Sequence, residues 1–200
     1  MKDRPRSRAL RPHRARLSGL TSVVLLLALH ARADTVANGS ASSADSPLSG
    51  VAAILNGSWR CSGQFANGKK ITSTEWFASL FSGRWLTQEH VDDLPFTYQA
   101  HSVWGWNGGL HVLTLTIYDN FGGSRLFTSS GWQDSALVFD ERPLVGVAAR
   151  QERFIYKLLP ARGYSVEYQV LDESHAWKMA DLLTCTRSPA AAVEEERTSH

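Results

Sequence analysis

The side chains best able to do chemistry in this 200-residue sequence are its histidines, its carboxylates and one pair of cysteines. No two histidines are spaced as His-x-His or His-x₃-His, and the cysteines do not form a Cys-x-x-Cys pair, so we expect no metal site. The sequence also lacks a Gly-x-Ser-x-Gly elbow and a phosphate-binding glycine loop. Any catalysis would therefore have to use isolated groups that the fold brings together.

Carboxylates are the first candidates for such chemistry. Glu75 stands beside two aromatic residues, and if it faced inward, burial would raise its pKa and suit it to proton transfer or to anchoring a ligand. We expect Glu75 to face water instead, because carboxylates are seldom fully buried. Asp181 poses the same question, since residues of its parity, such as Leu183, are mostly apolar. The adjacent acids Asp92 and Asp93 are typical of a solvated turn.

Histidines are the other candidates. His90, His101, His111 and His175 fall in four different segments of the chain. One inward histidine could act as an acid or base, or hold a haem iron, and by position His101 and His175 are the candidates. Because no haem-binding motif accompanies them, we expect ordinary surface or hydrogen-bonded histidines and no cofactor.

Aromatic side chains are the strongest indication of a binding site. All seven tryptophans fall between residues 59 and 177, with all eight phenylalanines and all five tyrosines. Such side chains line apolar pockets, although they also fill cores and seal the ends of barrels. Those that we expect to face inward and contact a ligand are Trp59, Trp85, Trp104, Tyr156 and Tyr168.

The elements that must position these side chains are strands. Between residues 57 and 187, β-branched and aromatic residues recur, and turn residues interrupt them every 8–14 positions or so, as in all-β proteins. Asn67-Gly68 is the strongest of the hairpin signals. The strands predicted from this pattern cover residues 58–66, 70–80, 84–91, 98–106, 110–118, 124–132, 135–140, 151–159, 164–171 and 176–186.

Short turns throughout pair each strand antiparallel with the next. About ten such strands should close into a barrel, because closure removes exposed edges, and a barrel of this width can hold a ligand. Residues 49–55 can form one or two helical turns that cover one mouth. The predicted fold is a single all-β, antiparallel up-and-down barrel of about 8–10 strands with a short N-terminal helical plug.

The two cysteines test this closure, since Cys61 lies in the first predicted strand and Cys185 in the last. In an oxidising compartment they are expected to be bonded, which requires the two terminal strands to be neighbours. Two separate buried thiols are the alternative.

The N-terminal segment has the three parts of an export signal. Residues 1–16 are rich in arginine, residues 17–29 are apolar, and Ala31-Arg32-Ala33 supplies small residues for cleavage. The apolar run is shorter than the roughly 20 residues that a membrane span needs. The predicted organisation is a signal peptide at 1–33, a flexible leader at 34–47, the barrel at 48–188 and a disordered tail at 189–200, in a periplasmic or extracellular protein.

Charge excludes one class of partner. Residues 1–33 contain eight of the 21 lysines and arginines and one of the 19 acids, which leaves 13 basic and 18 acidic groups in the rest of the chain. An acidic domain of this kind is unsuited to nucleic acid, whose affinity depends on basic side chains. No stable membrane span is expected after signal cleavage. The sequence does not indicate how many copies of the chain associate.

The first predicted strand opens with Gly57-Ser58-Trp59, followed by Gly63. This opening resembles that of lipocalin-like barrels of the calycin superfamily, and the stretches 83–86, 104–106 and 183–187 are similar to exported bacterial members of it. The resemblance covers residues 48–188 and implies that Arg187 packs as a cation over the Trp59 ring. It also implies a carrier of a small apolar molecule.

Two other functions remain open from the residues alone. One is a barrel enzyme of isomerase or hydratase type, with Glu75, His101, His175 or Asp181 as an internal acid or base. The other is a structural or interaction barrel whose interior is filled. A cavity inside the barrel favours carriage, convergent polar groups within it favour catalysis, and a filled core favours interaction.

Overall fold

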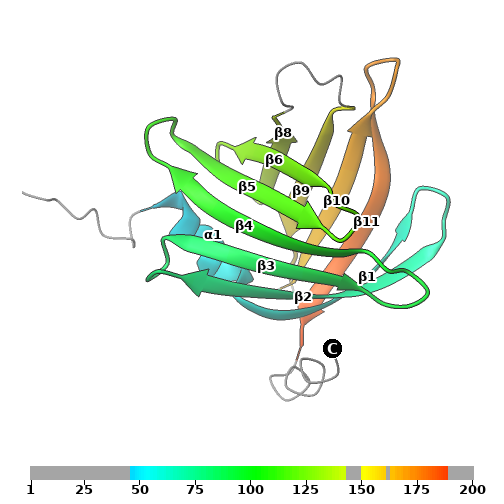
Figure 1. The fold of residues 1–200 in the computed structure, drawn as a ribbon, viewed down its shortest axis with the longest axis horizontal. Coiled ribbons are helices and arrows are strands. Elements are labelled where there is room, and N and C mark those ends of the chain that lie inside the picture. Colours follow the sequence, from blue (N-terminus) through cyan, green and yellow to red (C-terminus); the bar gives the residue numbers. More distant parts are fainter. Residues whose placement is uncertain (1–45, 143–149, 161–162, 189–200) are drawn as a thin grey trace, which may run out of the picture. The chain divides into compact units, whose positions relative to one another are not determined.

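The computed structural model describes residues 46–142, 150–160 and 163–188. The predicted signal peptide and tail, and all but the end of the leader, lie outside these residues. One helix and eleven strands follow each other along the described chain (Figure 1). Their bounds are α1 Pro47–Leu55, β1 Gly57–Phe65, β2 Lys70–Leu80, β3 Trp85–Asp92, β4 Gln99–Asn107, β5 Val112–Asp119, β6 Ser124–Ser129, β7 Trp132–Gln133, β8 Ala136–Glu141, β9 Glu152–Leu158, β10 Tyr164–Leu171 and β11 Trp177–Arg187.

Ten of the strands form a closed antiparallel barrel, as the sequence predicted. Consecutive strands pair from β1 through to β6 and again from β8 through to β11, and β1 pairs with β11. A pairing of β6 with β8 completes the ring, while the two-residue β7 pairs only with β8. The first and last strands are therefore neighbours.

One predicted strand is broken in two. Residues 124–132 were expected to be continuous, but β6 ends at Ser129, and Gly131 takes a positive φ of 100° before β7 begins. This backbone leaves the extended region, so the chain cannot continue the ladder. The β6–β8 seam consequently holds only two register pairs, Phe127 with Glu141 and Thr128 with Asp140.

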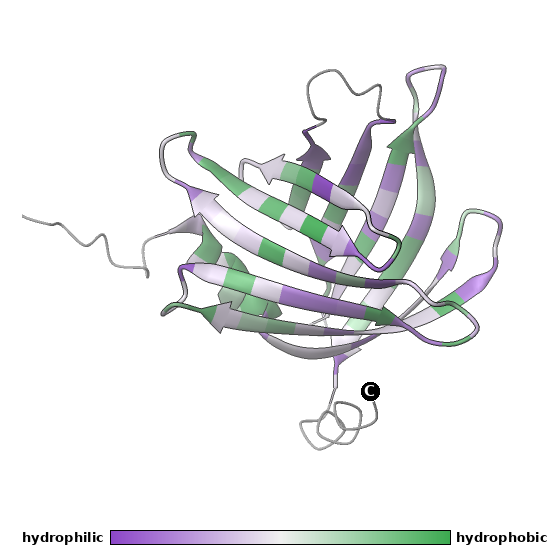
Figure 2. Ribbon diagram, viewed as in Figure 1, coloured by the Kyte–Doolittle hydropathy of each residue, from purple (hydrophilic) through white to green (hydrophobic). Residues whose placement is uncertain are grey.

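Alternation of side chains along the strands separates an apolar interior from a more polar exterior. In β5, Leu113, Leu115 and Ile117 are buried, whereas Thr114 and Thr116 between them are partly exposed. Figure 2 shows the same alternation of hydrophobic and hydrophilic residues along several strands. Successive side chains of a strand point to opposite faces, so one face of each strand lines the barrel.

The β2–β3 turn sets the register of the strands that carry the interior polar groups. Phe81, Ser82 and Gly83 all have positive φ, and the amide of Gly83 donates to the carbonyl of Leu80. The turn places Leu80 opposite Trp85, and each step back along β2 is matched by one forward along β3. Glu75 therefore lies opposite His90.

The helix α1 covers one end of the barrel, which we call the plugged end. Its buried residues Leu48, Val51, Ala52 and Leu55 follow helical spacing and join the barrel core. Arg187, the last residue of β11, donates through its guanidinium to the carbonyls of Ile54 and Asn56 at 2.7 and 2.6 Å. These bonds satisfy carbonyls at the end of the helix.

Aromatic rings fill the interior next to α1. The indole of Trp59 donates to the carbonyl of Leu55 at 2.6 Å and meets the ring of Tyr164 edge-on at 4.8 Å. Trp104 makes similar edge contacts with Phe139 at 5.0 Å and with Tyr156 at 5.3 Å.

Within the part of the chain that the structure describes, no helix has the length and apolar character to cross a membrane.

The predicted disulfide between Cys61 and Cys185 is confirmed. The two residues lie directly opposite each other on β1 and β11, are fully buried, and are separated by 124 positions in the sequence. Beside them, the Arg187 guanidinium lies 4.4 Å from the centre of the Trp59 ring, the contact that the resemblance implied.

Candidate functional site

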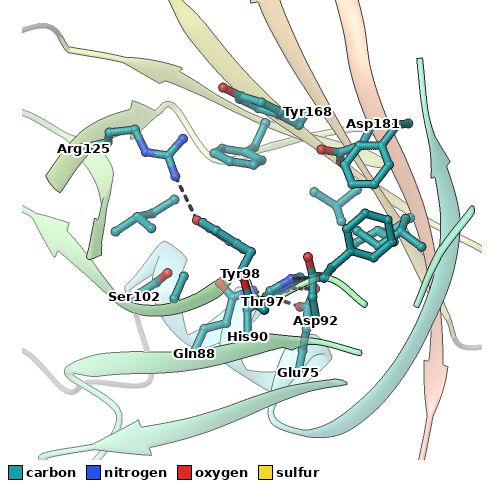
Figure 3. Close-up of a pocket in the computed structure, with 18 of the residues that line it drawn as sticks. Glu75, Gln88, His90, Asp92, Thr97, Tyr98, Ser102, Arg125, Tyr168 and Asp181 are labelled. Carbon is teal, nitrogen blue, oxygen red and sulfur yellow. Dashed lines mark hydrogen bonds and ion pairs between the residues drawn. The ribbon is translucent and has the colours of Figure 1, made fainter. Parts of the chain in front are cut away.

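A cavity of about 480 Å³ occupies the end of the barrel opposite α1, so side chains do not fill the interior. No residue of α1 lines it, whereas residues of the β3–β4 and β5–β6 connections do; Figure 3 shows ten of the lining residues with labels. We call this end the mouth. The apolar lining consists of Phe65, Ile71, Pro95, Phe96, Ala100, Ile117, Phe121, Phe154, Val166 and Leu183. The polar lining consists of Glu75, Gln88, His90, Asp92, Thr97, Tyr98, Ser102, Arg125, Tyr156, Tyr168 and Asp181.

Exposed apolar side chains surround the mouth. Leu94 and Phe121, which lie in the two connections there, are 85% and 73% exposed. Phe121 packs near the ring of Tyr98 at 6.2 Å, and Phe96 packs on Phe65 at 5.2 Å. An apolar molecule reaching the cavity would meet aromatic rings before the polar groups further in.

Glu75 is the centre of a buried polar cluster at the inner end of the cavity. Its side chain is 2% exposed, and its Oε2 accepts hydrogen bonds from the Tyr164 hydroxyl at 2.6 Å and from Gln88 Nε2 at 2.9 Å. Burial raises the pKa of Tyr164 well above its usual value, so the phenol stays protonated and can donate. The indole of Trp104 donates to Gln88 Oε1 at 3.2 Å, which orients the amide.

His90 joins this cluster to a second carboxylate. Its Nδ1 lies 3.2 Å from Glu75 Oε1, and its Nε2 lies 2.9 Å from Asp92 Oδ1. Burial by itself disfavours the charged ring, but the hydrogen bonds to Asp92 and Glu75 outweigh it and raise the His90 pKa to about 9. At neutral pH the imidazole is therefore a cation held between two carboxylates.

Arg125 forms a second cationic group on another part of the wall. Its Nη1 donates to Glu152 Oε2 at 2.8 Å, and its Nη2 donates to the Tyr98 hydroxyl at 2.9 Å (Figure 3). Asp119 Oδ2 lies 3.7 Å from the same Nη2. This guanidinium is also held between two carboxylates.

Asp181 differs from the other charged groups of the lining. Its side chain makes no hydrogen bond or ion pair with any residue that the structure describes, and Figure 3 shows it on the opposite side of the cavity from Arg125. Burial raises its pKa from 3.8 to about 6; the charge of His90 opposes this shift and that of Asp92 adds to it. At neutral pH Asp181 is an ionised carboxylate without a cationic partner.

The structure brings two of the four catalytic candidates into the cavity. Glu75 and Asp181 line it, so the expectation that Glu75 faces water is wrong. The burial is tolerated because Tyr164, Gln88 and His90 satisfy the Glu75 carboxylate.

The two predicted histidines lie outside the cavity. His101 is exposed on β4, and His175 is exposed in the β10–β11 turn with a positive φ of 58°. Neither can act inside the barrel or hold a haem there.

Four of the five predicted aromatic residues are in the interior. Tyr156 and Tyr168 line the cavity, and Trp59 and Trp104 are buried between it and the plugged end. Trp85 instead lies outside the barrel and is 43% exposed. It is paired with Gly105 on β4, where an added Cβ would come within 2.4 Å of the indole, so Trp85 covers the outer surface of a glycine.

The most important groups that the sequence interpretation missed are His90, Asp92 and Arg125. Asp92 was expected in a solvated turn, but it ends β3 with its side chain 5% exposed, while Asp93 beyond it forms an ion pair with Arg60 outside the cavity. The Ser82-Gly83 turn was a usable signal, because a short turn there already implies that Glu75 pairs with His90. The position of Arg125 depends on barrel closure and has no local signal.

A group of potential metal ligands among the described residues consists of Cys61, Cys185 and Glu75. The two sulfurs are bonded to each other and are therefore not thiolate ligands. The close approach of Glu75 instead places its carboxylate cluster directly beside the disulfide.

Comparisons with known proteins add no family assignment. No protein-family model matches the chain, and no curated protein matches it significantly. The barrel and the residues that line its cavity are therefore the features that indicate a function.

Proposed function

We propose that this chain is an exported, lipocalin-like binding protein that holds a small, largely apolar molecule inside its barrel. The observation that carries the proposal is the cavity of about 480 Å³ with aromatic side chains at its mouth. Pockets for small molecules have volumes of roughly 300–1,000 Å³ and combine apolar walls with a few oriented polar groups. Both features are present here.

Two further features support the lipocalin-like and exported parts of the proposal. The ten-strand antiparallel barrel, the helix at one end and the Arg187–Trp59 contact agree with the resemblance of the opening strand. A buried disulfide is typical of proteins that fold in an oxidising compartment.

The direct test is native mass spectrometry of the protein purified gently from its own host. We expect an added mass that disappears on denaturation and belongs to a largely apolar small molecule. Recovery of only the bare polypeptide would count against carriage of a tightly held ligand.

A matched pair of variants tests whether binding occurs in the cavity. Ala100→Phe adds a ring to the cavity wall, whereas Ala78→Phe adds the same ring to an exposed position on β2. We expect the first variant to weaken binding of the neutral fluorescent probe N-phenyl-1-naphthylamine at least about tenfold, because the ring takes up ligand space, and the second to leave it unchanged. Equal affinities in both variants would place the probe elsewhere.

A second candidate function, proton-transfer catalysis, is favoured by one observation. Asp181 lines the same cavity as the protonated His90, and its pKa of about 6 is close to the range that suits a general base. The ligand identified by mass spectrometry would be incubated with the protein in D₂O. Deuterium incorporation into carbon positions by the wild type, and not by Asp181→Asn, would support an enzyme of isomerase or hydratase type over a carrier.

A further inference from the structure

The charges that line the cavity are unequally matched. Its two cations, His90 and Arg125, are each held by two protein carboxylates, whereas Asp181 has no cationic partner among the described residues. Neither cation is therefore free to bind an acidic ligand without giving up an existing partner. The unmatched charge in the cavity is negative.

The neighbours of Asp181 on the sheet are aromatic. In the strand registers it lies opposite Phe65 of β1 and opposite Tyr168 of β10, and all three residues line the cavity. The Tyr168 ring stacks on Phe154 at 5.0 Å with an interplanar angle of 24°, and Phe65 packs on Phe96. A carboxylate between two aromatic rings is a favourable environment for an ammonium group, which gains both an ion pair and cation–π contacts.

We propose that the cavity selects ligands that carry a protonated amine on an apolar body, with Asp181 binding the ammonium group between Phe65 and Tyr168. This inference rests on the proposed binding function and specifies the chemical class of its ligand. The apolar body would lie against the aromatic and aliphatic walls towards the mouth. A carboxylate of the same size is disfavoured, because it would meet the charge of Asp181 without a free cation to bind it.

Three ligands that share one chain test the proposal: n-octylamine, 1-octanol and octanoate, each titrated into the full chain by calorimetry at pH 7.5. We expect the amine to bind at least about tenfold more tightly than the alcohol, and octanoate to bind more weakly than the alcohol. Asp181→Asn should reduce the affinity for the amine about tenfold and leave that for the alcohol within about twofold. Asp140→Asn, which makes the same change at an exposed position of β8, should alter neither.

The outcomes separate this inference from the proposed function. If none of the three ligands binds the wild type, while its circular dichroism shows a folded barrel, the binding function itself fails. If the alcohol binds but the amine binds no more tightly, or octanoate binds best, the amine selectivity is overturned and the binding function stands. A preference for the amine that persists in Asp181→Asn would overturn the role of Asp181.

Discussion

His90 shows how a single residue can make a barrel interior polar without making it unstable. Its two ring nitrogens face two carboxylates, and the remaining oxygen of Glu75 accepts bonds from Tyr164 and Gln88. Buried charges are tolerated when each has a partner of opposite sign and good hydrogen bonds. The cluster can therefore form a rigid inner surface for the cavity.

The charge on His90 should make stability depend on pH. Its pKa is about 9 in the folded protein and near 6.5 when the chain is unfolded, so the contribution is fully present below pH 6.5 and is lost as pH rises through 9. We expect unfolding free energy from urea titrations to fall by on the order of 2 kcal/mol across this range in the wild type, and much less in His90→Gln. The exposed His101→Gln serves as the control. Equal pH slopes in all three proteins would contradict a charged His90.

The charge on Asp181 should lower stability, so the contribution of Asp181 also falls as pH rises, but in a lower pH range. Its folded pKa of about 6 exceeds the value of 3.8 expected for a free carboxyl, so the folded state binds the proton more tightly and loses stability as pH rises from 4 to 6. Asp181→Asn removes this cost, and we expect the variant to be more stable than the wild type by about 1–2 kcal/mol at pH 7.5 when measured by urea unfolding without ligand. The gain should be much smaller at pH 4. A variant less stable at both pH values would show that the carboxylate has a stabilising partner.

For single residues, the sequence indicated which side chains could be functional more readily than whether each one faces into or out of the barrel. Glu75 and Asp181 were recognised as possible internal acids, but the direction of Glu75 depends on its partners in distant strands. Trp85 has the same parity on β3 as the exposed Glu89, whereas the other parity faces inward, and it lies outside over Gly105. His90 could have been paired with Glu75 from the turn between them.

Among the elements, α1 depends on a residue far from it in the sequence. Arg187 donates to two carbonyls at the end of the helix and lies over Trp59, and the Gly57 that follows the helix leaves room for the guanidinium. An added Cβ at Gly57, whose φ is +115°, would be 2.6 Å from Arg187 Nη1. The end of the helix, the start of β1 and the end of β11 thus form one structural unit.

Loss of this unit should destabilise the protein measurably. We expect Arg187→Ala to lower the unfolding free energy by about 1–2 kcal/mol, because it removes two charge-assisted hydrogen bonds and a cation–π contact. Arg187→Lys keeps the charge but not the paired donors, so an intermediate value is expected. Chemical unfolding monitored by tryptophan fluorescence gives both values. Two variants as stable as the wild type would mean that packing of the apolar helix face alone holds α1.

The strands were more predictable than the site, because alternation and turn residues are local signals. Nine of the ten predicted segments coincide with single strands, and the exception is the segment that breaks at Gly131. The break leaves the narrow β6–β8 seam, a contact between strands that no local pattern reports.

For the whole molecule, the disulfide joins the two ends of the barrel wall across 124 residues. Cross-linking a loop of that size restricts the unfolded chain, and we expect the Cys61→Ala/Cys185→Ala double variant to be less stable by about 2–4 kcal/mol in urea unfolding. Its circular dichroism should remain that of a β-protein, because β1 and β11 still pair along seven residues each. A loss of less than about 0.5 kcal/mol would mean that the strand pairing, and not the covalent bond, determines stability.

The described chain enters and leaves the barrel at the same end. Pro47 begins the helix of the plugged end, and the amide of Ser188, just after β11, donates to the carbonyl of Ser58 at the start of β1. The mouth lies at the other end, among the connections that contain Phe96 and Phe121. Coupling the protein to a biosensor chip next to Pro47 or next to Ser188 would therefore leave the mouth facing solution. Immobilisation at either position need not block uptake of a ligand.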